Sequence, residues 1–277
     1  KFNIIFYCIH RIINKLYNNQ NLNSMKKSIL LILSIMFCIS LSSQRNPGAE
    51  YWISYTYNPK KGMTEEFEKA VAEKTKKFNS SEENAFFTFQ TLTGNQQGAY
   101  QRWQVRKSVG YFDEDRKKEG KYWNDNVDPM IAEKSGQIIW MRLKGASHGW
   151  DESRMPDKFY TQETVVIKRG KNQDFLKFHR RFTQLMSDIE WTGNRGMFKL
   201  NNGGNVQTYM LIHGFNEHNW MSYSTNLEQG TNWVEVYDEK FGENAWAEDR
   251  ELANSAIESW GATSRKLEFR PDLSSKL

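Results

Sequence analysis

The sequence predicts an α+β fold built from two diverged copies of one β-α-β-β-α-β unit. Residues 62–67 match residues 170–175 at an offset of 108, and strand-like and helix-like segments then follow in the same order after both windows. The first 43 residues differ in composition from the rest and read as a leader. The chain from residue 44 onward is long enough to bury a core without disulfides.

The N-terminal segment has the pattern of a secretory signal peptide. Residues 25–27 (Met-Lys-Lys) are a short basic start, residues 29–41 form an apolar run interrupted only by serines, and small residues follow at 42–43. This run is too short for a membrane span, which needs about 20 residues. We therefore expect a signal peptide over 25–43, preceded at 1–24 by sequence outside the native protein, and a secreted or periplasmic mature chain without membrane association. A retained N-terminal anchor is the alternative.

Charge and cysteine content limit the functions of the mature chain. The formal net charge is +5, but residues 1–43 carry five basic and no acidic side chains, so the remainder has 33 of each sign. Nucleic-acid binding usually needs a clustered basic surface that neutralises phosphates, whereas residues 74–77 form only a short basic run that we interpret as a solvated helix face. Nucleic acid is therefore not an expected partner. Both cysteines lie in the leader, which excludes disulfides, thiol nucleophiles and thiolate metal sites downstream.

Each copy opens with a strand, a glycine and an amphipathic helix. Gly62, Thr64 and Phe67 correspond to Gly170, Asn172 and Phe175. Threonine and asparagine side chains commonly accept a hydrogen bond from the first turn of a helix, so Thr64 and Asn172 are expected to cap the two helices. Apolar residues then recur at helical spacing through 67–78 and 175–189.

A hairpin, a second helix and a closing strand complete each unit. Segments 86–92 and 99–105, and likewise 196–200 and 206–213, flank turns rich in asparagine, glutamine and glycine. Tyr100 then corresponds to Tyr209, and Trp123, in a helical stretch, corresponds to Trp233. Closing strands are expected at 137–144 and 265–269, which requires a helical insertion near 243–260 in the second copy.

This element order is that of the ferredoxin-like arrangement, in which helices cover one face of a four-stranded sheet. The strand residues Trp52, Phe87, Phe89, Trp103 and Trp140 are expected to place aromatic side chains on both faces. The second face must also be buried, and the matching sheet of the other copy is the nearest partner. The sequence thus predicts two ferredoxin-like repeats, 50–145 and 158–277, joined by a linker at 146–157 and packed as an intramolecular dimeric α+β barrel.

The tandem units resemble the dimeric α+β barrel superfamily, which includes the antibiotic-biosynthesis-monooxygenase-like, EthD-like and NIPSNAP-like families. The resemblance covers roughly residues 50–270 and rests on topology, on the repeat and on the opening of the helices, since no catalytic motif matches residue by residue. It implies a single-chain pseudo-dimer with a pocket between the sheet and the helices of each unit. It also implies small aromatic or haem-like ligands.

Five strand residues are candidates for binding a ligand. On the strand 99–105, Tyr100, Arg102 and Gln104 share one face, and they face the pocket if Trp103 packs under the helices. An outward polar face at the sheet edge is the alternative. Tyr209 and His213 are the candidates in the second copy, and the divergence of His213 from its counterpart Gln104 suits a site in one half only.

No metal or catalytic motif is recognisable. His213 and His218 are five residues apart with Gly214 between them, which does not match the spacing of metal ligands on a helix, so no metal site is expected. His179 is expected at the surface or boundary of its helix. No serine elbow, phosphate loop or dinucleotide fingerprint occurs. The ten tryptophans, all downstream of the leader, are interpreted mainly as core residues, with a sugar-stacking surface as the alternative.

Three functions remain open at this point. The first is a secreted binding protein or weak enzyme that holds a small hydrophobic or aromatic molecule among the five candidate residues. The second is a cofactor-independent monooxygenase or a haem-handling enzyme, as the resemblance implies. The third is a non-catalytic interaction module that uses Trp246, Ile257 and Trp260 as an exposed apolar patch. The cofactor stays undetermined, and a monomeric pseudo-dimer is compatible with the sequence.

Overall fold

The computed structural model describes residues 48–150, 155–217 and 232–276. The signal-peptide prediction over 25–43, the preceding segment and His218 lie outside the described residues. All described helices and strands belong to one unit, Ala49–Leu277.

The two copies, named repeat 1 and repeat 2, contribute the same kinds of element. Repeat 1 contains β1 (Tyr51–Pro59), α3 (Thr64–Phe78), β2 (Phe87–Thr91), β3 (Tyr100–Lys107), α4 (Lys117–Asn126), β4 (Ile131–Lys134) and β5 (Ile138–Arg142). Repeat 2 contains β6 (Phe159–Ile167), α5 (Asn172–Asp188), β7 (Asn194–Asn202), β8 (Thr208–Phe215), α6 (Trp233–Phe241), α7 (Ala245–Ser255) and β9 (Ile257–Phe269). The short strand β4 pairs with the end of β1.

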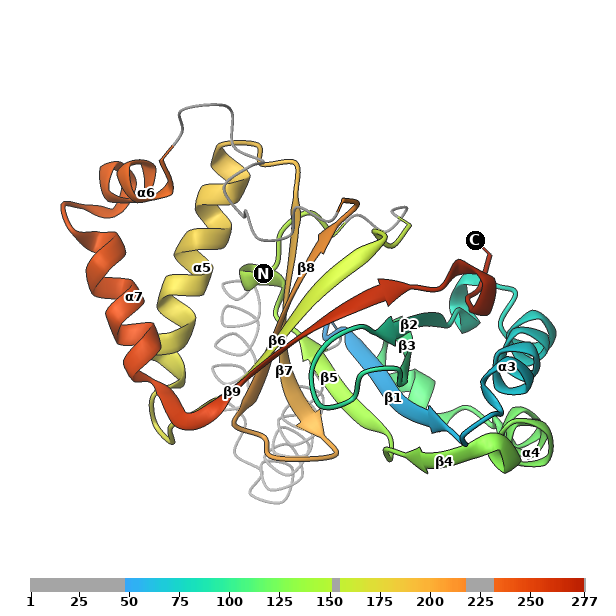
Figure 1. Cartoon of the computed structure of the whole chain (residues 1–277). Helices are drawn as coiled ribbons and strands as arrows, with labels where there is room; N and C mark the ends of the chain where they lie inside the picture. The colour runs from blue at the N-terminus through green and yellow to red at the C-terminus, as the bar shows by residue number, and fades with distance from the viewer. Residues whose placement is uncertain (1–47, 151–154, 218–231, 277) are drawn as a thin grey trace, which may run out of the picture. The chain divides into compact units, whose positions relative to one another are not determined.

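The strands of both repeats follow one order and close a barrel. The pairings give β2-β3-β1-β5 in repeat 1 and β7-β8-β6-β9 in repeat 2. β2 pairs with β9 and β5 pairs with β7, both antiparallel, so the two sheets join along both edges (Figure 1). Closure removes the sheet edges that each repeat would expose alone. The predicted fold, two ferredoxin-like repeats packed as an intramolecular α+β barrel, is confirmed.

The turns before α3 and α5 show the repeat at the level of the backbone. Gly62 and Gly170 both adopt positive φ, +80° and +85°, a conformation that glycine reaches without steric cost. The capping prediction is wrong, because Thr64 and Asn172 are the first helical residues and no side-chain cap forms at either helix. Asn172 Oδ1 instead accepts a hydrogen bond from the Tyr209 hydroxyl at 2.9 Å.

The barrel interior is an aromatic core shared by both repeats. Repeat 2 contributes Tyr160 and Phe198, among other residues. The expectation that five repeat-1 aromatics divide between the two faces of their sheet is wrong, since all five belong to this one core: Trp52, Phe87, Phe89, Trp103 and Trp140. Trp103 therefore points into the barrel and not toward the helices.

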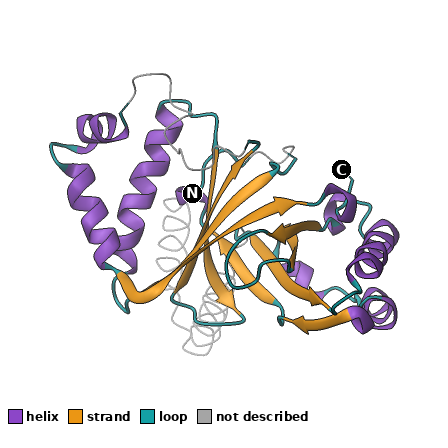
Figure 2. Cartoon of the chain, in the orientation of Figure 1, coloured by secondary structure: helices purple, strands orange, loops and turns teal. Residues whose placement is uncertain are grey.

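The helices lie outside the barrel, against the outer faces of the two sheets (Figure 2). His179 on α5 is buried between Phe175 and Phe178, so its expected surface or boundary position is wrong. It follows Phe175 by one turn and therefore shares the face that α5 turns toward the sheet. Within the described residues, no helix combines the length and apolarity that a bilayer crossing requires.

The predicted insertion near 243–260 is only partly helical. α7 ends at Ser255, and β9 already begins at Ile257, well before the predicted strand at 265–269. Trp246 packs edge-on against Phe178 of α5, whereas Trp260 is 71% exposed on β9. The apolar patch expected from Trp246, Ile257 and Trp260 is therefore not formed.

Candidate functional site

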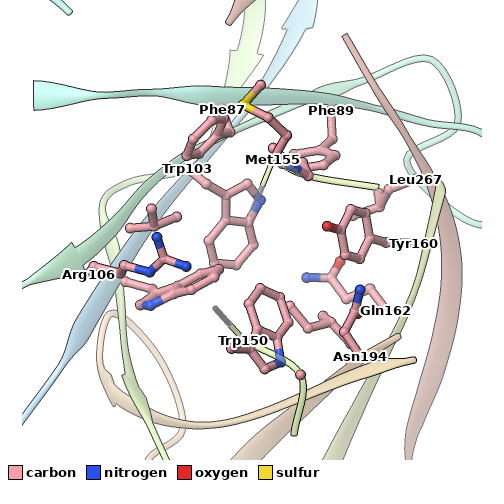
Figure 3. Close-up of a pocket in the computed structure, with 15 residues that line it drawn as sticks. Phe87, Phe89, Trp103, Arg106, Trp150, Met155, Tyr160, Gln162, Asn194 and Leu267 are labelled. Atoms are coloured by element: carbon pink, nitrogen blue, oxygen red, sulfur yellow. The ribbon is translucent and has the colours of Figure 1, made fainter. Parts of the chain in front are cut away.

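Two of the cavities in the described part of the chain lie on opposite faces of the repeat-1 sheet. The first is a narrow space of about 70 Å³ inside the barrel, where aromatic rings from both repeats surround it (Figure 3). The second, of about 380 Å³, lies between the outer face of the sheet and the helices α3 and α4, and we call it the repeat-1 cavity. Small-molecule pockets typically measure about 300–1,000 Å³, so the repeat-1 cavity is the candidate site.

Aromatic side chains form much of the wall of the repeat-1 cavity. They are Tyr55, Tyr57, Phe86, Tyr111, Phe112 and Trp123. The rings of Tyr57 and Trp123 lie with their centroids 4.7 Å apart. Burial raises the pKa of Tyr57 and of Tyr111, which keeps both phenols neutral at physiological pH. Neutral rings of this kind offer flat surfaces that suit an aromatic ligand.

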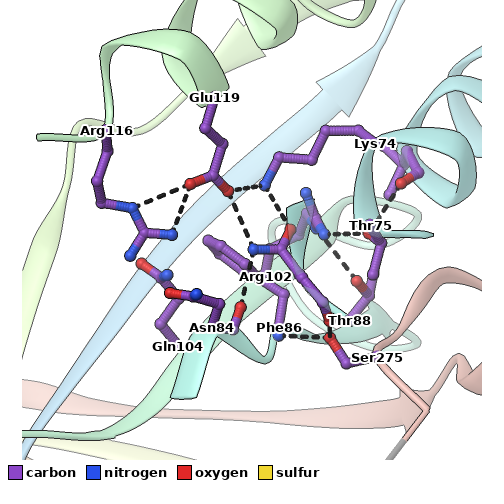
Figure 4. Close-up of polar contacts among 12 residues, drawn as sticks. Lys74, Thr75, Asn84, Phe86, Thr88, Arg102, Gln104, Arg116, Glu119 and Ser275 are labelled. Carbon is purple, nitrogen blue, oxygen red and sulfur yellow. Dashed lines mark hydrogen bonds and ion pairs between the residues drawn. The ribbon is translucent and has the colours of Figure 1, made fainter. Parts of the chain in front are cut away.

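Arg102 projects from β3 into this space and is 1% exposed. Its Nε donates to Thr88 Oγ1 at 3.2 Å, and its Nη2 donates to Thr75 Oγ1 at 2.6 Å (Figure 4). Its guanidinium carbon lies 4.6 Å from the centre of the Phe86 ring. Within the described part of the chain, no carboxylate forms an ion pair with it. Burial lowers the pKa of Arg102 to about 10, so the group stays charged at neutral pH.

Lys74 reaches the same space from α3. Its Nζ donates to Asn79 Oδ1 at 2.8 Å and pairs with Glu119 of α4, which also accepts from Arg116 Nε at 2.9 Å (Figure 4). Burial, followed by the charge of Arg102, lowers the pKa of Lys74 to about 7. Burial raises the pKa of Glu119, but Lys74 and Arg116 outweigh it and hold that pKa at about 2. The Glu119 carboxylate therefore pairs with two cations, Lys74 and Arg116.

The cavity consequently carries an excess of positive charge. Three basic side chains line it, Lys74, Arg102 and Arg116, together with two acidic ones, Glu114 and Glu119. Glu114 is exposed to solvent, which screens its charge. The buried part of the site is therefore cationic, and its unpaired charge is that of Arg102.

Two of the three repeat-1 candidates line this cavity. Arg102 does so directly, and Gln104 shares a hydrogen bond with Tyr111 at the wall. Tyr100 lies under α3, with its ring 5.2 Å from that of Phe67. The prediction assumed that Trp103 packs under the helices. Trp103 instead points into the barrel, so the three candidates on the other face of β3 are turned toward the helices. The larger cavity nevertheless lies on their side of the sheet, and their role in binding stays a prediction.

The two repeat-2 candidates lie elsewhere. Tyr209 packs on Phe175 of α5 with centroids 5.3 Å apart. His213 sits opposite Arg195 in the β7–β8 pairing, and burial together with the charge of Arg195 lowers its pKa to about 3. Neither residue lines the repeat-1 cavity, so the structure does not bring the five candidates into one site. The binding role of Tyr209 and His213 also stays a prediction.

Repeat 2 carries different residues at the equivalent positions. The strand pairings that align Tyr100 with Tyr209 place Leu211 where repeat 1 has Arg102. The helix offset of 108 places Phe182 where repeat 1 has Lys74. Phe182 packs with Phe178, Trp233 and Trp246 in an apolar cluster. The two cations thus have apolar counterparts in the other copy.

Sequence reasoning missed Lys74, Arg116 and Glu119. The interpretation of residues 74–77 as a solvated helix face holds for Lys76 and Lys77 but is wrong for Lys74 and Thr75, which are buried. Helical spacing was the available signal, since position 74 follows the apolar positions 67 and 71 on one face of the helix. Arg116 and Glu119 are three residues apart and pair with each other, but that spacing gives no sign of Lys74, the second partner of Glu119, which lies on another helix.

The residues of the cavity do not fit a haem group. Haem iron takes histidine, cysteine, methionine or tyrosine as its axial ligand. None of the first three lines the repeat-1 cavity, and burial raises the pKa of Tyr55, Tyr57 and Tyr111, which opposes a tyrosinate ligand. His179 and His213 line neither cavity described above. In the parts of the chain that the structure covers, no group of three or more His, Cys, Asp or Glu side chains could hold a metal ion.

Comparisons with known proteins find similarity at the level of the fold. No family model and no curated protein matches the sequence. Among solved structures, a monooxygenase-like protein from Lactobacillus acidophilus NCFM is 13% identical, with 82% of this chain and 96% of that chain covered and a TM-score of 0.49. A chlorite dismutase from Candidatus Nitrospira defluvii in complex with imidazole is 9% identical, with coverages of 79% and 91% and a TM-score of 0.45. A heme-binding protein from Thermus thermophilus is 8% identical, with coverages of 81% and 92% and a TM-score of 0.44.

Proposed function

Because this chain has the fold of the dimeric α+β barrel superfamily, with both repeats in one polypeptide, we propose that it binds a small aromatic molecule in the repeat-1 cavity. We also propose that it does so as a secreted or periplasmic protein, on the strength of the signal-peptide pattern at 25–43. One observation carries the binding proposal: an aromatic-walled space of about 380 Å³ beside a few buried polar groups.

This combination is what small-molecule pockets usually have. Their walls are largely apolar and aromatic, and a small number of placed polar groups fixes the orientation of the ligand. Tyr57 and Trp123 supply ring faces here, while Arg102 and Gln104 supply polar groups on the sheet side. Burying a ligand ring against such walls gains about 25 cal/mol per Å² of apolar surface.

The barrel interior is the weaker alternative as the main site. Its space of about 70 Å³ admits only a few water-sized groups. Binding is proposed in preference to a reaction, because the lining of the repeat-1 cavity contains no serine, cysteine or histidine. The amine of Lys74, which could act as a base, is engaged with Glu119 and Asn79.

Binding is tested with a matched pair of tryptophan variants. Trp123 lines the repeat-1 cavity, and its counterpart Trp233 is similarly half-buried in repeat 2. Isothermal titration of the mature chain with 2-naphthol should give saturable binding at one site. Trp123→Ala should weaken it at least tenfold, whereas Trp233→Ala should leave it within about twofold. Equal losses in the two variants, or no saturable binding by either 2-naphthol or an aromatic acid, would contradict the proposal.

Export is tested separately from binding. Expression of the chain with its leader in a bacterial host should deliver the protein outside the cytoplasm, with a mature N-terminus close to residue 44 by mass spectrometry. Replacing the apolar run 29–41 with a polar sequence should retain the protein inside. An uncleaved leader on the exported chain would favour the anchor alternative.

A further inference from the structure

We infer that the molecule bound in the repeat-1 cavity carries a carboxylate or a comparable acidic group, and that this group pairs with Arg102. The inference rests on the proposed function and adds the chemical class of the ligand. Its basis is the hydrogen bonding of Arg102, the surrounding charges and the contrast with repeat 2.

The guanidinium of Arg102 has hydrogen-bonding capacity to spare. Arginine has five N–H donors, and two of them are used by Thr88 and Thr75. In the described residues, no acceptor takes the other three. A buried charge without a counter-ion is costly, and a planar guanidinium matches a carboxylate through two parallel hydrogen bonds. An acidic ligand would supply both the charge and the acceptors.

The two threonines beside Arg102 act only as acceptors toward it. Thr88 Oγ1 lies 3.1 Å from the Leu273 carbonyl oxygen, and Thr75 Oγ1 lies 2.8 Å from that of Val71 and 3.2 Å from that of Leu273. A hydroxyl has a single proton, and here a backbone carbonyl receives it. Each hydroxyl therefore presents a lone pair to the guanidinium. This arrangement fixes one edge of Arg102 and leaves the rest of the group for a ligand.

The C-terminal tail of repeat 2, residues 270–275, holds this arrangement in place. Ser274 Oγ accepts from the backbone N–H of Thr88 at 2.8 Å. Ser275 Oγ accepts from the backbone N–H of Phe86 at 2.9 Å, a contact drawn in Figure 4. The backbone N–H of Ser275 donates in turn to the Phe86 carbonyl at 2.9 Å. An arginine of repeat 1 is thus oriented by a segment of repeat 2, so the fusion of the repeats contributes to the site.

A second cation strengthens the case for an acidic ligand. Lys74 Nζ lies 4.3 Å from the centre of the same Phe86 ring that Arg102 contacts. Its carboxylate partner Glu119 is shared with Arg116. Two buried cations beside one shared carboxylate leave a site that an anion would neutralise.

Repeat 2 does not carry these two charges at the equivalent positions. Leu211 and Phe182 occupy the positions of Arg102 and Lys74, and both pack in apolar clusters. Replacing buried charges by apolar residues of similar size is often neutral or stabilising. Repeat 2 does hold a buried arginine from another strand, since Arg195 of β7 is 2% exposed and donates to Thr183 Oγ1, the counterpart of Thr75, at 3.4 Å. Arg102 differs from it in lining the repeat-1 cavity, which points to a role in recognition.

The experiment compares a matched acid and amide, 2-naphthoate and 2-naphthamide, by titration into the mature chain at pH 6.5. The acid should bind at least ten times more tightly. In Arg102→Met the preference for the acid should disappear. In Lys76→Met, which removes an exposed charge from helix α3, it should persist. Equal affinity for both compounds would overturn this inference and leave the proposed function standing, whereas no binding by either would overturn both.

Threonine variants keep the test decisive if Arg102→Met does not fold. Thr88→Val removes the acceptor that orients Arg102 while preserving its charge, and Thr88→Ser restores the hydroxyl. The acid preference should fall about threefold to tenfold in Thr88→Val and return in Thr88→Ser, while the affinity for the amide stays constant in both. A loss that affects acid and amide equally would indicate damage to the cavity and contradict the positioning role of Thr88.

Discussion

Lys74 is a buried amine whose charge depends on pH near neutrality. Its pKa is about 7 in the folded chain, because burial and then the charge of Arg102 disfavour the ammonium. In the unfolded chain the pKa is about 10.4. Between these values the unfolded state binds more protons than the folded state, so this group makes stability rise with pH. The contribution of Lys74 to the free energy of unfolding is complete above about pH 10 and is lost as the pH falls to 7.

The predicted consequence is a pH-dependent difference between the wild type and Lys74→Met. Their free energies of unfolding should diverge in favour of the wild type from pH 7 to pH 10, with a slope of up to about 1.4 kcal/mol per pH unit. Urea denaturation at several pH values measures it. Lys76→Met, on the exposed face of α3, should show a constant offset from the wild type. A constant offset for Lys74→Met as well would contradict the depressed pKa.

The residue scale also shows where sequence reasoning stops. Arg102 and Gln104 could be proposed from strand alternation alone, because alternate residues share a face. Whether that face points into the barrel or toward the helices could not be predicted from alternation, since it depends on the side toward which the barrel closes. Lys74 could have been found from helical spacing, but its partner Glu119 lies 45 positions away on another helix. A pairing of this kind is set by tertiary packing.

At the scale of elements, β7 passes close beneath the linker residue Trp150. A Cβ at Gly196 would lie 2.6 Å from Trp150 Cζ2 and 2.9 Å from Ile212 Cγ1, closer than real contacts allow. Gly196→Ala should therefore destabilise the fold by about 1–3 kcal/mol through overpacking. Gly136→Ala is the matched control, since nothing lies within 4 Å of its Cβ. Urea denaturation of both variants measures the effect. Equal stability in the two would show that the Trp150 side chain moves aside without lowering the free energy of unfolding.

The length of β9 illustrates why element boundaries were harder to predict than element order. Aligning a closing strand at 265–269 with the one at 137–144 left extra residues in the second copy, which favoured a helical insertion near 243–260. In the structure, β6 pairs with β9 from Ile257 to Glu268, and this long partner extends the strand toward α7. Strand propensity depends strongly on such pairing, so local sequence alone does not fix where β9 begins.

At the scale of the whole molecule, the repeat was sufficient to predict the closed barrel. The correspondence of Gly62 with Gly170, and of Tyr100 with Tyr209, implied two like units, and the need to bury a second sheet face implied their pairing. The location of the cavity in repeat 1 could not be predicted in this way. It depends on side chains from α3, α4 and β3 and on the C-terminal tail, which are far apart in sequence.

The two seams of the barrel, β2–β9 and β5–β7, make the repeats depend on each other. Each repeat alone would expose its inner face, which carries Trp52 and Trp103 in repeat 1 and Tyr160 and Phe198 in repeat 2. Fragments 44–150 and 151–277 should therefore self-associate or aggregate when expressed singly. Co-expressed, they should form a one-to-one complex, while the intact chain should be a monomer because both seams close within it. Native mass spectrometry distinguishes these species, and a folded monomer of either fragment would show that one sheet face can remain uncovered.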